Sequence, residues 1–66
     1  MEKFIKLTDR AWGKPTYYNT RYIVSYYASE NVVTVVTKES SGYHTMSVVE
    51  TLDEIFEQIG RANAGS

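Results

Sequence analysis

Few side chains in this sequence are suited to acid–base, nucleophilic or metal chemistry. The chain has one histidine, His44, and no cysteine, and it contains no glycine-rich phosphate loop. A catalytic histidine needs a carboxylate that orients its ring; Glu50 and Glu54 are the candidates, and no pattern selects either of them. One histidine with helical acids also lacks the ligand spacing of a metal site. We therefore predict a protein that is not an enzyme and that has no catalytic residue, metal or cofactor.

Tyrosine is the most unusual part of the composition. Six tyrosines and one tryptophan stand in a chain of 66 residues, whose small core has room for few large rings. Neighbouring side chains of a strand point to opposite faces, so one member of each pair Tyr17-Tyr18 and Tyr26-Tyr27 must lie away from the core. Exposed tyrosines are typical of protein interfaces. We predict a protein interface formed by Tyr18, Tyr26, Tyr27 and Trp12.

The same aromatic residues allow a second interpretation, in which they stack on the bases of single-stranded nucleic acid. Residues 1–27 hold five basic and two acidic side chains, a balance of +3, and residues 28–66 hold two basic and six acidic ones, a balance of −4. The contact residues of this alternative would be Lys6, Lys14, Arg21, Tyr17 and Tyr22. A third interpretation is that cross-strand pairs of aromatic rings only stabilise the sheet.

The sheet that must position these residues has its predicted centre at residues 31–37. Both alternating faces of this run are apolar or β-branched, with Val33, Val35 and Thr37 on one face and Val32, Thr34 and Val36 on the other. A half-buried strand would show one polar face. The run is therefore expected in the middle of the sheet.

Shorter alternating or β-prone runs predict flanking strands over residues 3–8, 16–19, 22–28 and 43–48. In the first of these strands, Ile5 and Leu7 are expected to point inward. The connection at residues 29–31 has hairpin length and predicts an antiparallel pair. Trp12 is the one large apolar side chain of the loop at residues 9–15. We expect it to cover one end of the core, with a binding role as the alternative.

The last element has the clearest local signature. Thr51 and Glu54 fit a capping box, so the helix should begin at Leu52 and Gly60 offers a stop. An apolar stripe at helical spacing is formed by Leu52, Ile55, Phe56 and Ile59. This stripe is expected to cover one face of the sheet. The acidic residues of the first turns would imitate phosphates if exposed together, but the helix dipole explains them more simply.

These elements predict one α+β domain over residues 1–60. We expect a four- or five-stranded, mostly antiparallel sheet with one C-terminal helix packed on one face, followed by a flexible tail at residues 61–66. A chain of 66 residues has room for one domain. Residues 1–6 lack the apolar run of a signal peptide, and no window approaches roughly 20 apolar residues, so we expect a cytoplasmic protein that does not enter a membrane. The absence of cysteine favours a reducing compartment.

The order of these landmarks resembles the FlbD-like family of small flagellar-operon proteins. The resemblance is carried by short pieces spread over residues 4–59, namely Phe4-Ile5-Lys6-Leu7-Thr8, Gly13, Tyr18-Asn19, Ile23, Thr34-Val35-Val36, Gly42, Val49-Glu50, Glu54-Ile55 and Ile59. Short proteins of phage and bacterial genomes that have no assigned activity are similar in the same way. The resemblance implies a small sheet-plus-helix fold, and it supplies no catalytic residues.

One short helix shields only one face of such a sheet, and the other face stays open to a partner. We therefore predict a small binding or regulatory module that acts through protein–protein contacts, encoded by a phage or mobile element and directed at a host protein. Self-association is a common way for so small a domain without disulfides to gain stability, so a homo-oligomer is also expected. The alternative function is nucleic-acid binding by the tyrosine-rich basic surface.

Overall fold

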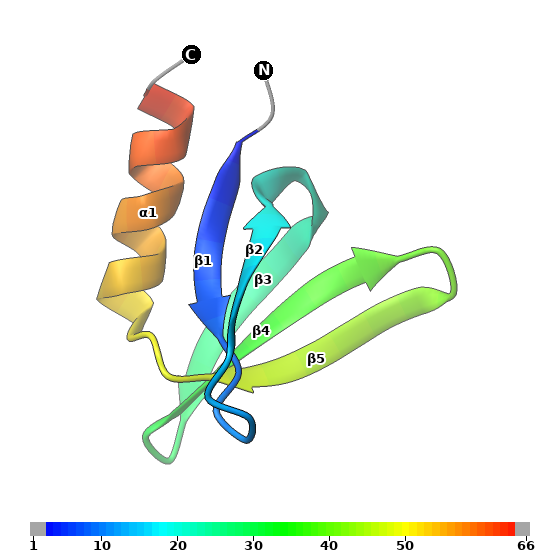
Figure 1. Cartoon of the computed structure of the whole chain (residues 1–66), viewed down its shortest axis with the longest axis vertical. Helices are drawn as coiled ribbons and strands as arrows, with labels where there is room; N and C mark the ends of the chain where they lie inside the picture. The colour runs from blue at the N-terminus through cyan, green and yellow to red at the C-terminus, as the bar shows by residue number, and fades with distance from the viewer. Residues whose placement is uncertain (1–2, 65–66) are drawn as a thin grey trace.

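The computed structural model describes residues 3–64, which form five strands, one short 3-10 turn and one α-helix (Figure 1). The strands are β1 (Phe4–Thr8), β2 (Pro15–Asn19), β3 (Ile23–Ser29), β4 (Val32–Glu39) and β5 (Gly42–Val48). The turn η1 (Thr20–Tyr22) connects β2 to β3, and the helix α1 (Leu52–Ala64) follows β5. No helix in this part of the chain is both long enough and apolar enough to span a membrane.

The strands form two antiparallel sheets, β1-β2 and β3-β4-β5. An isolated bridge between Asp9 and Val48 joins the two sheets at the end of β1. The two sheets do not pair further along β1, because two side chains from the segment after β5 bind the backbone at the free edge of β1. The Gln58 side chain bonds to the backbone of Lys6, and the Glu50 carboxylate accepts from the Thr8 N–H. The α+β class and the C-terminal helix are thus confirmed, whereas the prediction that all strands share one sheet is wrong.

The run at residues 31–37 does supply the central strand, as its two apolar faces predict. β4 lies between β3 and β5, and Val35 and Thr37 are buried on its inner face. The residues of its other face, Val32, Thr34 and Val36, are half-buried by their neighbours in the sheet. The β3–β4 hairpin closes through Glu30 and Asn31, which both have positive φ, as a two-residue turn requires.

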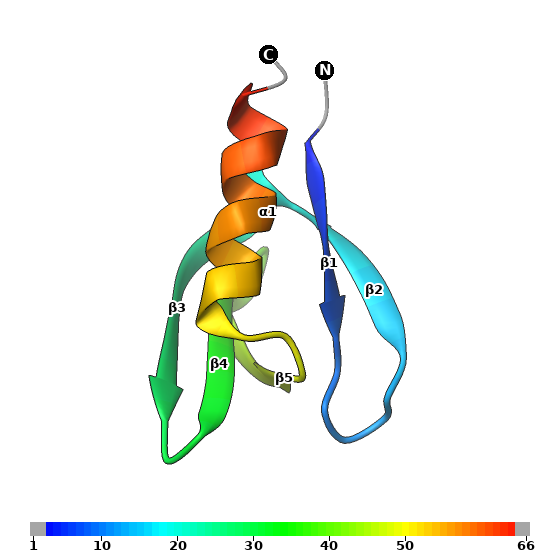
Figure 2. The ribbon, with the colours of Figure 1, turned by 90° about the vertical axis from the view of Figure 1, so that its left-hand side faces the viewer.

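The core lies between the two sheets and under the helix. Its fully buried members come from four elements and are Ile5, Leu7, Val35, Val48 and Ile55. Figure 2 shows α1 in front of the opening between β1 and β3, and it packs against both of these strands. The β1–β2 hairpin and α1 therefore lie on the same side of the three-stranded sheet.

The capping box predicted at the start of α1 is present. The Glu54 N–H donates to Thr51 Oγ1 at 3.1 Å, and the Thr51 N–H donates to Glu54 Oε1 at 2.9 Å. The predicted stop at Gly60 is wrong, because the helix continues to Ala64 and residues 61–64 are helical. Ala62 is half-buried, one turn beyond Ile59, so the helix face toward the sheets continues past the glycine. Residues 65 and 66 of the predicted tail lie outside the described residues.

The predicted apolar stripe of α1 is correct except at Phe56, which is 71% exposed. The helix instead turns Ile55, Gln58, Ile59 and Ala62 toward the rest of the molecule. Gln58 fixes this rotation because its side-chain amide bonds both backbone groups of Lys6. A polar residue that pairs with a strand edge thus takes an inward position, and Phe56 is left on the solvent side.

Candidate protein-interaction site

The face of the three-stranded sheet that points away from α1 is assembled by strand register. Residues directly opposite one another in antiparallel strands share a face. We call this surface the outer face; its residues are Ser25, Tyr27 and Ser29 of β3, Val32, Thr34, Val36 and Lys38 of β4, and Tyr43, Thr45 and Ser47 of β5. No helix or strand among residues 3–64 covers it, since α1 packs on β1 and β3 from the opposite side.

The outer face combines exposed aromatic rings with a half-buried centre. Tyr27 is 49% exposed and Tyr43 is 67% exposed, and they stand on the two strands that flank β4. Thr34 lies opposite Tyr27 on one side and opposite Ser47 on the other. Aromatic rings around a row of β-branched side chains form a surface that is apolar but still carries hydroxyl groups for hydrogen bonding.

Charge is almost absent from the outer face. Lys38 is its one charged member, although the chain contains seven basic and eight acidic residues. Depletion of charged residues is the compositional feature that distinguishes the cores of protein interfaces from the rest of a surface. The outer face has this feature over three adjacent strands.

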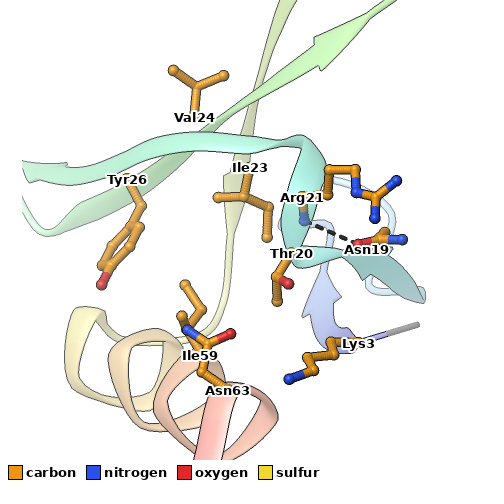
Figure 3. A pocket seen from close by; sticks show the side chains of 9 residues that line it. All are labelled: Lys3, Asn19, Thr20, Arg21, Ile23, Val24, Tyr26, Ile59 and Asn63. Carbon is orange, nitrogen blue, oxygen red and sulfur yellow. Dashed lines mark hydrogen bonds between the residues drawn. The ribbon is translucent and has the colours of Figure 1, made fainter. Parts of the chain in front are cut away.

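A bulge in β3 adds an apolar residue beside this surface. The register shifts between Ile23 and Ser25, so that two residues of β3 correspond to one of β4. Figure 3 shows the Val24 side chain on the opposite side of the ribbon from Ile23, which points toward α1. Val24 is 54% exposed. It therefore extends the apolar surface at the β3 edge.

The structure places the predicted interface residues on different surfaces. Tyr27 lies on the outer face, but Tyr18 and Tyr26 are half-buried and pack against the core cluster. Trp12 does not cover the core, because its side chain is 77% exposed in the loop between β1 and β2. It lies instead near Lys14, whose Nζ is 6.0 Å from the centre of the indole ring. One member of each tyrosine pair does point outward, as alternation predicts.

Tyr43 belongs to the outer face but was not among the predicted interface residues. Alternation along residues 43–48 groups it with Thr45 and Ser47, and these three do share one face. The information that was missing is the register with β4, which sets Thr45 opposite Val36 and Ser47 opposite Thr34. The signal that would have identified Tyr43 is that it shares a strand face with the hydroxyl side chains Thr45 and Ser47, next to the uncovered face of β4.

The residues proposed to contact nucleic acid do not form one surface. Lys6 and Tyr17 are opposite each other in the β1–β2 hairpin, and Lys14 lies in the loop before β2. Arg21 and Tyr22 belong to η1, beyond the other end of β2. Lys6 also shares a hollow with the acidic residues Glu50, Glu54 and Glu57. This separation of the basic residues, and the acids beside Lys6, do not favour the nucleic-acid alternative.

His44 has polar neighbours, but they do not form a catalytic arrangement. Its Nε2 is 4.0 Å from Glu39 Oε1 and 3.5 Å from Ser41 Oγ. Both contacts use the same ring nitrogen, whereas general-base catalysis uses one nitrogen for the nucleophile and the other for the orienting carboxylate. Glu50, which the sequence offered as a partner, is bonded to Thr8. These contacts therefore connect side chains around the β4–β5 turn.

No family model matches the chain, and no curated protein or solved structure shows a significant match. The resemblance to FlbD-like proteins therefore stays a prediction.

Proposed function

We propose that this protein is a small non-enzymatic binding or regulatory module whose outer face forms the contact with a second copy of the chain or with a protein partner. The observation that carries the proposal is the charge-poor surface of Tyr27, Tyr43 and the β4 row between them. A monomer seldom leaves such a surface without a use. The setting we propose is that of a phage or mobile-element protein that acts on a host protein.

The size of the outer face sets an expectation for its affinity. Three strands spaced about 4.8 Å apart, each about seven residues long at roughly 3.4 Å per residue, give a footprint on the order of 14 Å by 23 Å. Stable interfaces bury about 800 Å² on each partner. The footprint is smaller than this even when relief from the side chains is added. We therefore expect self-association to be weak and dependent on concentration.

Sedimentation equilibrium tests this proposal over a range of concentrations from micromolar to about a millimolar. A species larger than the 7.5 kDa monomer is expected to accumulate toward the upper end. Tyr27→Ser should shift the distribution toward monomer, because it removes an exposed ring of the outer face that lies directly opposite Thr34 of the central strand. Tyr17→Ser is the control, since Tyr17 is an exposed tyrosine, at 66% against 49% for Tyr27, on a strand of the other sheet.

Two outcomes would contradict the proposal. One is a strict monomer at every concentration that also captures no host protein in a pull-down, or captures the same proteins with and without Tyr27. The other is an oligomer that Tyr27→Ser leaves intact while Tyr17→Ser dissociates it, which would place the contact on the β1–β2 hairpin. In either case the outer face would be a packed sheet surface with no partner.

A further inference from the structure

The free edges of the two sheets are protected to different extents. A strand at the edge of a sheet exposes backbone N–H and C=O groups that can pair with another chain, and proteins block such edges with prolines, bulges or covering elements. Side chains of Gln58 and Glu50 cover the edge of β1. β2 is short and begins at Pro15, whose nitrogen carries no hydrogen. β3 contains a bulge and packs against α1.

β5 has none of these protections over residues 42–46. This stretch contains no proline, lysine, arginine or acidic residue. Among residues 3–64, β5 pairs with β4 and otherwise meets only the bridge between Asp9 and Val48 at its end. Figure 1 shows the β4–β5 hairpin extending away from α1 and the β1–β2 hairpin, with no other element beyond β5 near the turn. We call the unpaired side of residues 42–46 the open edge.

The direction of the backbone groups along β5 follows from one hydrogen bond. The Arg10 N–H donates to the Ser47 carbonyl oxygen at 2.9 Å, so the backbone groups of Ser47 face away from β4. In antiparallel strands, the backbone groups of alternate residues face the same side. Those of Tyr43 and Thr45 therefore face the open edge, while the residues between them bond to β4. The open edge ends at Ser47, where Arg10 already occupies it.

We infer that the open edge pairs antiparallel with β5 of a second copy of the chain, with the two His44 residues opposite each other at a twofold axis. In this register Tyr43 of each copy lies opposite Thr45 of the other, and each pair exchanges both of its backbone hydrogen bonds. A shift of the partner strand toward Ser47 would place it on Arg10. A shift the other way would leave Thr45 unpaired.

Side chains on and beside the open edge favour a second copy as its occupant. Tyr43 and Thr45 are exposed on the outer face, so the register would place an aromatic ring beside a β-branched side chain, a favourable cross-strand pair. Arg10 is exposed at the end of the open edge, and the partner's β4–β5 turn, which starts at the exposed Glu39, would lie next to it. Opposite charges would therefore meet at both ends of the contact.

Pairing at the open edge would also enlarge the outer face. Residues directly opposite one another share a face, so the outer faces of the two copies would join on one side of a six-stranded sheet. Six strands about 4.8 Å apart and about seven residues long give a footprint on the order of 29 Å by 23 Å. With side-chain relief added, this approaches the roughly 800 Å² that each partner buries in a stable interface. The edge contact would thus supply the area that a single outer face lacks.

Hydrogen exchange of individual amides, followed by NMR on the whole chain, tests this contact at about 50 micromolar and at about a millimolar. The Tyr43 and Thr45 amides should exchange fast in the dilute sample and about fivefold more slowly in the concentrated one, because pairing gives them acceptors. Tyr17 is the internal control. It lies opposite Lys6, whose backbone bonds to Gln58 away from β2, so the Tyr17 amide faces the free edge of β2. Its exchange should not depend on concentration.

A substitution at Thr45 gives a second readout. Thr45→Pro removes an N–H from the open edge and no hydrogen bond to β4, so it should weaken association about tenfold or more while the chain keeps a folded circular dichroism spectrum. Thr45→Val is the matched control, because it keeps the N–H and the β-branched shape. It should associate like the original protein in sedimentation equilibrium. If Thr45→Pro does not fold, the exchange rates of the original protein decide.

The inference is overturned if the Tyr43 and Thr45 amides exchange equally fast at both concentrations, or if the Tyr17 amide gains equal protection. Equal association of folded Thr45→Pro and Thr45→Val overturns it as well. Protection that occurs only after a host extract is added would assign the open edge to another protein and overturn the second copy as its occupant.

The edge contact and the outer face can fail separately. Tyr27 is on β3, on the other side of β4 from the open edge, so Tyr27→Ser should leave the exchange at Tyr43 and Thr45 dependent on concentration. An oligomer that Tyr27→Ser dissociates, and that shows no protection of these two amides, would overturn the edge contact alone. Protection of both amides together with an oligomer that Tyr27→Ser does not affect would support the edge contact and contradict the outer face as a contact between copies.

Discussion

The Glu50 carboxylate accepts two hydrogen bonds from Thr8, one from the backbone N–H at 2.7 Å and one from the hydroxyl at 2.8 Å. Glu50 is only 8% exposed and lies between β5 and α1. It therefore occupies the edge of β1 at the point where a neighbouring strand would otherwise pair. Gln58 occupies the same edge two residues earlier in β1: its side-chain oxygen accepts from the Lys6 N–H at 2.9 Å, and its side-chain N–H donates to the Lys6 carbonyl oxygen at 3.0 Å.

Replacing Glu50 tests how much this edge contributes to stability. Glu50→Ala removes both acceptors and leaves the Thr8 N–H and hydroxyl part-buried without them, so we expect a loss of about 1.5–3 kcal/mol in the free energy of unfolding. Glu50→Gln keeps one acceptor and should lose less. Urea denaturation measures both values. Glu57→Ala, an exposed acid of the helix, is the control and should have little effect.

The Gln58–Lys6 pair gives a second prediction. Gln58→Ala removes two hydrogen bonds from a partly exposed strand edge, where water replaces some of what is lost. We expect a loss of about 1 kcal/mol in the free energy of unfolding. Hydrogen exchange should also become faster at the Lys6 amide, because its acceptor is gone. An unchanged rate at Lys6 would contradict the proposed role of Gln58 as a cover for this edge.

Substitutions at Ile55 and Phe56 distinguish the observed rotation of α1 about its own axis from the rotation that the apolar stripe predicts. Ile55 is fully buried and Phe56 is exposed. Ile55→Ala should cost about 2–5 kcal/mol and unfold so small a domain at moderate temperature. Phe56→Ala should change stability by about 0.5 kcal/mol or less. Thermal unfolding followed by circular dichroism measures both, and a large loss for Phe56→Ala would indicate the rotation predicted from the stripe.

The elements that depend on neighbouring residues in the sequence could be predicted. Thr51 and Glu54 are three residues apart, and their capping box is present. The inward positions of Ile5 and Leu7 follow from alternation and are confirmed. What could not be predicted depends on contacts distant in the sequence. The bond from Gln58 to Lys6 spans 52 residues, and the bond from Glu50 to Thr8 spans 42.

The sequence allowed the prediction that one sheet face is open, but not the prediction of which residues form it. One helix leaves one sheet face open, whatever the register of the strands. The choice between Tyr26 and Tyr27 depends on that register. Strict alternation from the inward Ile23 would turn Tyr27 inward, but the bulge between Ile23 and Ser25 reverses the order. A bulge has no signature in these residues, so the sequence predicted both tyrosines as interface residues.

The capping box gives a prediction that isolates the start of the helix. Thr51→Ala removes the hydroxyl that accepts from the Glu54 N–H, so we expect a loss of about 1 kcal/mol, within the usual range of about 0.5–2 kcal/mol for such caps. Thr51→Ser keeps an oxygen at the same place and should be close to the original protein. Denaturation midpoints in urea compare the three proteins. Equal losses for both variants would show that the methyl group, and not the hydroxyl, matters.

The adjacent residues Tyr26 and Tyr27 allow stability and association to be separated in one experiment. Tyr26 packs against the core cluster from the inner face, whereas Tyr27 is on the outer face and half exposed. Tyr26→Ser should therefore lower the free energy of unfolding by about 2 kcal/mol or more, because it leaves a cavity beside the core. Tyr27→Ser should change the stability of the monomer little.

Their effects on association should be the reverse. Measured well below the unfolding transition, Tyr27→Ser should shift the sedimentation profile toward monomer, while Tyr26→Ser should leave the proposed self-association unchanged as long as the variant stays folded. A second outer-face change, Thr34→Lys, should act like Tyr27→Ser, since it places a charge at the centre of a surface that is poor in charge. If Tyr26→Ser dissociates a folded dimer and Thr34→Lys does not, the contact lies on the inner side of β3.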